Sequence, residues 1–188
     1  MRSGIAATIV LIGVMAACGA DPPTVTPEPA LAHFDAPGIA FDYPATWNVA
    51  SFDMVSSFSA LVAYLSTEPL FDPCVRTPNS IACEGLPVRQ QLGPNGVLVD
   101  WTHRGWPGWE FDPTAGPGAF IGGRRATVQH PPVSGRCASI GGNTELLVVI
   151  DSGVQSNWDE VWTCSRQGLD DLTASQIDAM LASVRWKN

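Results

Sequence analysis

The segment TASQIDAMLASVRW, residues 173–186, decides the fold class. Thr173 and Gln176 have the spacing of a capping box, which is a signal for the start of a helix. Apolar residues then recur at i, i+3, i+4 and i+7, at Ile177, Met180, Leu181 and Val184. This spacing predicts a C-terminal amphipathic helix with one apolar face. Because the segments before it have the patterns of strands, we predict an α+β domain that this helix closes.

Strand signals occupy much of the chain upstream of that helix. Ile39, Phe41 and Tyr43 alternate with less apolar residues, and Pro44 ends the alternation. Residues 59–65 also alternate, but an apolar stripe from Phe52 to Leu65 fits a helix as well, so residues 51–58 have a helical alternative. Further strands are predicted at 97–101, after the turn signal Pro94-Asn95-Gly96, and at 125–129, 145–151 and 160–165.

Three segments resemble a known fold family. They are GIAFDYPATWNV (38–49), IGGRRATV (121–128) and IDAMLASVRW (177–186). They are similar to the Mog1/PsbP-like domains found in many exported bacterial lipoproteins. The resemblance implies an antiparallel β-sheet packed by helices. It carries over no catalytic residue, because members of this family are largely binding or assembly factors.

The N-terminus has the features of an export signal. Arg2 supplies a positive charge, Ile5 to Met15 is an uncharged apolar run, and Ala16-Ala17 are small residues of the kind that precede a cleavage site. Met15-Ala16-Ala17-Cys18 resembles the lipobox of bacterial lipoproteins, which implies cleavage before Cys18 and lipidation of its thiol. The alternative is a plain secretory signal cut near Ala20. The expectation is an extracytoplasmic protein, lipid-anchored to the cell membrane of a bacterium.

The organisation expected from these signals has three parts. Residues 1–17 are the lipoprotein signal peptide, 18–37 are the lipidated Cys and a Pro-rich tether, and 38–188 form a single α+β domain. A chain that is 45% hydrophobic and 15% charged can build a core. Its 10 basic residues against 18 acidic ones give a net charge of -8, which argues against a nucleic-acid partner.

Four cysteines remain after Cys18, namely Cys74, Cys83, Cys137 and Cys164. An even number in an exported chain indicates two disulfides, with three connectivities to choose from. We favour Cys74 with Cys83, across a short Pro-containing loop, and Cys137 with Cys164, between neighbouring strands or their loops. The alternative of a metal site lacks closely spaced Cys or His pairs.

The segment DWTHRGWPGWEFDP, residues 100–113, is the candidate binding site. It gathers aromatic and polar side chains in a Gly- and Pro-rich frame, and exposed aromatic faces bind sugars, acyl chains or protein partners. The alternative is that its rings fold back over the sheet as a structural lid. The candidate binding residues are Trp101, His103, Arg104, Trp106, Trp109 and Phe111.

Catalytic and metal-binding patterns are weak in this chain. GxSxG, SxxK, HExxH, GxGxxG and the P-loop pattern are all missing from the sequence. Asp100, His103, Glu110 and Asp112 are ligand types, but their spacing fits no known metal motif, so no metal and no cofactor is predicted.

The function expected from the sequence is that of a non-catalytic binding or assembly module of the cell envelope. Its partner would be an envelope protein, lipid or glycan, held near the tryptophans of residues 100–113. The alternative is a carrier of a small molecule or lipid, with an apolar pocket under that segment. A metal-dependent or hydrolytic enzyme ranks third.

Overall fold

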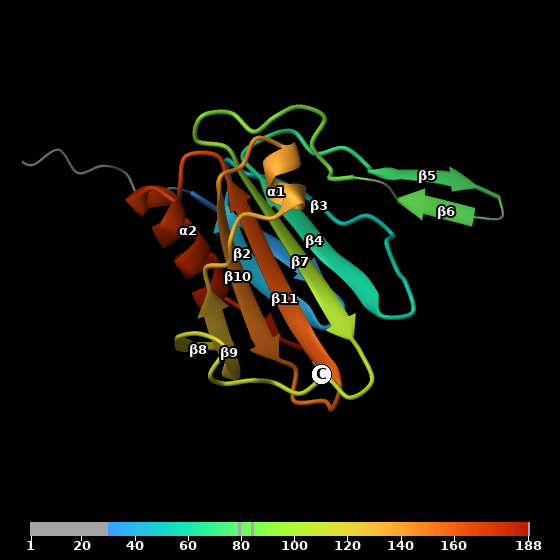
Figure 1. Cartoon of the computed structure of the whole chain (residues 1–188), viewed down its shortest axis with the longest axis vertical. Helices are drawn as coiled ribbons and strands as arrows, with labels where there is room; N and C mark the ends of the chain where they lie inside the picture. The colour runs from blue at the N-terminus through green and yellow to red at the C-terminus, as the bar shows by residue number, and fades with distance from the viewer. Residues whose placement is uncertain (1–29, 79, 84, 188) are drawn as a thin grey trace, which may run out of the picture.

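A large antiparallel sheet forms the centre of the computed structural model, which describes residues 30–78, 80–83 and 85–187. Its strand order is β3-β4-β7-β11-β10-β9-β8, and each neighbouring pair is antiparallel. In chain order the seven strands are β3 (Asn48–Ala50), β4 (Ser59–Ser66), β7 (Val97–Gly105), β8 (Gly118–Ile121), β9 (Arg124–Gln129), β10 (Thr144–Asp151) and β11 (Asn157–Ser165) (Figure 1).

Two smaller sheets and two helices complete the molecule. The small sheet has the order β1-β2-β12, and β5 pairs with β6 in a hairpin that projects from the body (Figure 1). Their bounds are β1 (Leu31–Ala36), β2 (Ile39–Pro44), β12 (Arg185–Trp186), β5 (Cys74–Thr77), β6 (Ser80–Cys83), α1 (Gly135–Ser139) and α2 (Asp171–Ala182). None of these helices is long and apolar enough to cross a membrane, within the part of the chain that the structure describes.

The predicted α+β class and the predicted strands agree with this architecture. Strands β7, β9, β10 and β11 cover the segments predicted at 97–101, 125–129, 145–151 and 160–165, and β2 covers the alternation that begins at Ile39. Residues 59–65 lie in β4. The helical alternative for residues 51–58 is wrong, because this segment is a loop that contains one isolated bridge, between Val55 and Ala60.

The predicted boundary between tether and domain is also wrong. Strand β1 lies inside the segment assigned to the tether and pairs with β2 from Leu31 opposite Pro44 to Ala36 opposite Ile39. Phe34 stacks on Phe41 at 4.8 Å between ring centroids, so this strand contributes to the core as well. The folded domain therefore includes residues before 38. Cys18 and the predicted signal peptide lie outside the described residues.

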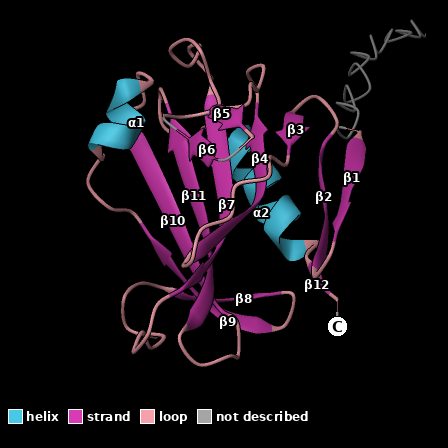
Figure 2. Ribbon diagram, turned by 90° about the vertical axis from the view of Figure 1, so that its right-hand side faces the viewer, coloured by secondary structure: helices cyan, strands magenta, loops and turns pink. Residues whose placement is uncertain are grey.

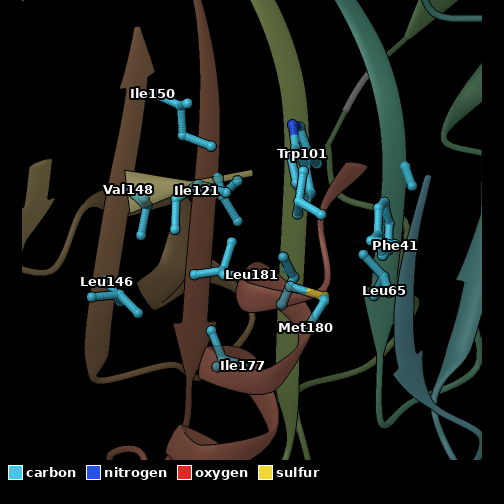
Figure 3. Close-up of a cluster of buried hydrophobic side chains, with 14 of the residues drawn as sticks. Phe41, Leu65, Trp101, Ile121, Leu146, Val148, Ile150, Ile177, Met180 and Leu181 are labelled. Atoms are coloured by element: carbon cyan, nitrogen blue, oxygen red, sulfur yellow. The ribbon is translucent and has the colours of Figure 1, made fainter. Parts of the chain in front are cut away.

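Helix α2 and the small sheet cover one face of the large sheet (Figure 2). The helix begins after Asp170, whose carboxylate accepts a hydrogen bond from the Thr173 amide at 2.6 Å. Thr173 lies inside the helix, so the capping box predicted at Thr173 is wrong. Ile177, Met180 and Leu181 are buried, and Figure 3 shows them among the side chains of the main core.

A second, smaller core lies on the opposite face, under α1. Ser134 caps α1, and Cys137 within it forms a disulfide with Cys164 of β11. Cys74 and Cys83 form the other disulfide, directly across the β5–β6 hairpin. Both favoured pairings are confirmed. The expectation that Cys137–Cys164 joins two neighbouring strands or their loops is corrected, because one partner sits in a short helix.

Candidate functional site

Strand β7 divides the candidate binding residues between the two faces of the large sheet. Trp101 and His103 point to the face covered by α2, while Asp100, Thr102 and Arg104 point to the opposite face, as alternation along a strand requires. The sequence cluster at residues 100–113 is therefore not one site.

Trp101 belongs to the main core. Its side chain is fully buried, it stacks on Phe41 at 5.0 Å between ring centroids, and it meets the edge of Trp186 at 6.2 Å. A ring without solvent exposure cannot contact a partner, so the assignment of Trp101 to a binding surface is wrong. The residue is better explained by packing between the two sheets.

Trp106 lies on an exposed aromatic surface at one end of the large sheet. Its side chain is 57% exposed, and its ring lies 4.6 Å from that of Phe58, which is 47% exposed. The Trp106 amide donates to the Ser156 carbonyl at 2.8 Å, and the Gly105 amide donates to the Phe58 carbonyl at 2.9 Å. These bonds tie three loops together at this end. We call Phe58 and Trp106, with the exposed Val154 from the same turn as Ser156, the end surface.

Trp109 and Phe111 instead lie back over the sheet. Trp109 stacks on Trp158 of β11 at 4.2 Å, with 19° between the ring planes. The guanidinium of Arg125 lies 5.2 Å from the centre of the Phe111 ring. Both rings are partly buried. The segment after β7 thus combines the two alternatives: Trp109 and Phe111 have the packing expected of a lid, and Trp106 has the exposure expected of a binding residue.

A pocket of about 390 Å³ opens on the sheet face that carries Arg104. We call it the sheet-face pocket; its lining includes Met54, Leu61, Tyr64, Asp100, Arg104 and Arg136. Both residues of one ion pair, and the arginine of a second, line this pocket. Arg104 Nη2 is 3.0 Å from Glu160 Oε1, and the Arg136 guanidinium pairs with the buried carboxylate of Asp100. Asp100 also accepts a hydrogen bond from the Thr102 hydroxyl at 2.6 Å.

Contacts around Arg136 and Tyr64 fix the geometry of this floor. The Arg136 guanidinium also lies over the ring of Trp162, 4.4 Å from its centre, so it is held by both charge and stacking. Tyr64 is buried beside Asp100, and this burial, together with the negative charge of Asp100, raises the pKa of Tyr64 to about 12. The Tyr64 hydroxyl therefore stays protonated.

His103 faces a different and smaller hollow, of about 310 Å³, on the other side of the sheet. Its Nδ1 lies 3.5 Å from the buried carboxylate of Asp159, which also faces Arg124 at 3.6 Å. The hydrogen bond to Asp159 raises the pKa of His103 above its ordinary value of 6.5, against an opposing effect of burial. Ser152 lines the same hollow, but its hydroxyl donates to the backbone carbonyl of Asn157 at 2.7 Å.

The residues weighed as metal ligands are not brought together. Asp100 and His103 lie on opposite faces of the sheet, and Glu110 and Asp112 are exposed in the loop that follows β7. No group of three His, Cys, Asp or Glu side chains among the described residues has the arrangement of a metal site.

Sequence reasoning missed most residues of the two surfaces. Phe58 and Tyr64 come from the loop before β4 and from β4 itself, which pairs with β7. Arg136 comes from α1, which a disulfide joins to β11. One signal did exist for Arg136, since it precedes Cys137, whose disulfide partner lies in the strand next to β7. No family model matches this chain, and neither a curated protein nor a solved structure is significantly similar to it.

Proposed function

We propose that this protein is a lipid-anchored, extracytoplasmic binding or assembly module without catalytic activity. Its anchor would be Cys18, and its partner an envelope protein, lipid or glycan that contacts the end surface. The export signal and the lipobox-like residues support the anchor. Two disulfides support an oxidising compartment, because such bonds persist mainly outside the cytoplasm.

The observation that carries the binding role is the exposed pair Phe58–Trp106. Large aromatic side chains are enriched where proteins bind partners, and here two of them are held half-exposed by backbone hydrogen bonds between loops. A rigid aromatic surface binds at a small entropic cost, because few rotamers are lost. Nearby Val154, 59% exposed, extends the apolar character of this end.

The proposal includes the fold family and the character of the last helix. The Mog1/PsbP-like assignment is supported by an antiparallel sheet followed by a C-terminal helix that packs on it. The amphipathic reading of α2 is supported by the burial of Ile177, Met180 and Leu181 together with the exposure of Asp178 and Ala179.

A carrier function is the second candidate. The volume of the sheet-face pocket, about 390 Å³, supports this function, because ligand sites span roughly 300–1,000 Å³. For a carrier the sequence predicts an apolar pocket, whereas this one is lined by the Arg136–Asp100 ion pair and by Arg104, and it opens to solvent. A hydrolytic or metal-dependent enzyme ranks third, because the Ser152 hydroxyl near His103 is directed to the backbone and Asp100 lies on the other face.

Two variants of the full chain test the proposal in its own host. Cys18→Ala is expected to move the protein from the membrane fraction to the soluble fraction. For the unmodified protein we expect a high-mass complex after mild extraction. The double variant Phe58→Ala/Trp106→Ala is expected to keep its Tm but to be absent from that complex. Phe120→Ala is the matched control, because Phe120 is 75% exposed on the edge strand β8. Equal loss of the complex in both aromatic variants, or loss in neither, would contradict the role of the end surface.

A further inference from the structure

From the sheet-face pocket we infer a second binding site, which takes a neutral polyhydroxylated ligand such as a single sugar residue. It lies on the face of the large sheet that carries α1, opposite α2 and the small sheet (Figure 2). The inference rests on the proposed function in one respect: that function places the domain in the envelope, where it can meet glycans. The inference does not require the end surface to bind a partner.

The charges at the floor favour a neutral ligand. Each guanidinium is already paired, Arg104 with Glu160 and Arg136 with Asp100. Because each pair is neutral overall, an anionic or a cationic ligand gains little net attraction from it unless the ligand separates the pair. Separating a partly buried pair leaves an uncompensated charge, which costs more than the pair itself contributes. A neutral ligand avoids that cost.

The hydrogen-bonding groups favour hydroxyls. The side chains of Arg104 and Arg136 are 35% and 37% exposed, and each uses one terminal nitrogen for its carboxylate, so further N–H donors remain. The carboxylate of Asp100, which lines the pocket, keeps lone pairs that can accept hydrogen bonds. A hydroxyl both donates and accepts, so neighbouring hydroxyls on a sugar can bridge a guanidinium and its carboxylate together.

The walls and floor favour a compact ring over an extended peptide. Met54, Val55 and Leu61 supply an apolar wall, against which the C–H face of a sugar ring can pack. The floor strands β4 and β7 pair with each other, and β11 pairs with the other edge of β7, so β7 offers no free edge for an added strand. The volume of about 390 Å³ is at the small end of ligand sites.

The test is a set of titrations followed by NMR of the full chain in nanodiscs of zwitterionic lipid. The probes are the neutral methyl glycosides of glucose, galactose and mannose, with glucuronate and glucosamine as charged counterparts. We expect at least one neutral glycoside to bind, to shift the resonances of residues such as Leu61 and Thr102, and to bind at least tenfold more tightly than either charged sugar. Octyl glucoside below its micelle concentration separates the sources: tighter binding than methyl glucoside supports a glycolipid headgroup, and equal binding supports a glycan.

Variants that remove one member of an ion pair test whether the paired charges exclude charged ligands. Glu160→Gln frees Arg104, which lines the pocket, and is expected to raise the affinity for glucuronate about tenfold. Arg136→Gln frees Asp100, which also lines the pocket, and is expected to raise the affinity for glucosamine about tenfold. Arg125→Gln is the matched control, because it breaks an exposed ion pair with Asp151 outside the pocket. If a charge variant does not fold, Met54→Trp, which fills the pocket from its wall, is expected to abolish binding at unchanged Tm.

The inference is overturned if no neutral glycoside binds the unmodified protein, if charged sugars bind it more tightly than neutral ones, or if Met54→Trp binds as well as the unmodified protein. Such failure leaves the proposed function standing as long as Phe58→Ala/Trp106→Ala still releases the complex. If Phe58→Ala/Trp106→Ala stays in the complex, that result contradicts the proposed function independently of the sugar titrations.

Discussion

Replacing Cys137 and Cys164 together with alanine removes the crosslink between α1 and β11, and we expect this to destabilise the domain strongly. The two cysteines are 27 positions apart, and both are fully buried. The loop-entropy relation gives about 3.6 kcal/mol for a crosslink of this span, through its effect on the unfolded chain. For a domain of this size that corresponds to a fall in Tm of about 7–14 °C.

The second disulfide supplies a matched control. Cys74 and Cys83 are nine positions apart, and the same relation gives about 2.7 kcal/mol if the hairpin stays ordered without its crosslink. The hairpin projects into solvent with Val75 70% and Ile81 51% exposed, so little packing would keep it ordered. A hairpin that unpairs in the native state regains its chain entropy there, and we expect a net loss of less than about 1 kcal/mol.

The assay is thermal unfolding of both double variants by calorimetry under non-reducing conditions, with peptide mapping to verify the remaining disulfide. The expected order is a large fall in Tm for Cys137→Ala/Cys164→Ala and a small one for Cys74→Ala/Cys83→Ala. Equal falls in the two variants, or the reverse order, would refute the reasoning from burial and hairpin exposure.

Three further predictions follow from single contacts. Trp109→Ala is expected to lower the free energy of unfolding by about 1 kcal/mol or more, because its stacking on Trp158 is lost. Trp106→Ala is expected to change the free energy of unfolding by less than about 0.5 kcal/mol, because this side chain is exposed. Chemical denaturation of the two variants measures both changes. Gly142→Ala places a Cβ against both sulfurs of the buried disulfide and is expected to cost about 1–3 kcal/mol, whereas Gly135→Ala, with open space around it, is expected to be tolerated in the same assay. Because the pKa of His103 is raised in the folded protein, its protonated form stabilises the fold. The stability advantage of the unmodified protein over His103→Gln should be complete below pH 6.5 and disappear as the pH rises through the folded-state pKa of His103. A difference in Tm between the two proteins that stays constant from pH 5 to 8 would contradict this.

Local signals in the sequence were sufficient for most of the central sheet. Strands β2, β9, β10 and β11 could be predicted because turns separate them and apolar residues alternate or cluster within them. The cysteine pairing could be predicted because four cysteines allow few connectivities and sequence separation ranks them. Strand β1 was missed because Pro29 and Pro37 flank it, and its pairing with β2 outweighs a composition that looks like a tether.

The candidate site was only partly predictable, because it depends on which side of the sheet each residue faces. Trp101 shares a short segment with Trp106, yet one is buried in the core and the other is 57% exposed. The sequence alone does not show that β7 ends at Gly105, which places Trp101 inside the strand and Trp106 in the loop after it. The sheet-face pocket depends on the register between β4 and β7 and on the position of Arg136 in α1, which are tertiary features.

Photocrosslinking in living cells shows whether the end surface binds an envelope partner. A photoreactive phenylalanine analogue placed at Trp106 is compared with the same analogue at Phe120, which is exposed on β8. We expect a discrete adduct from position 106 that is isolated with the envelope fraction, and no such adduct from position 120. Absence of any adduct at position 106, or the same adducts from both positions, would contradict it.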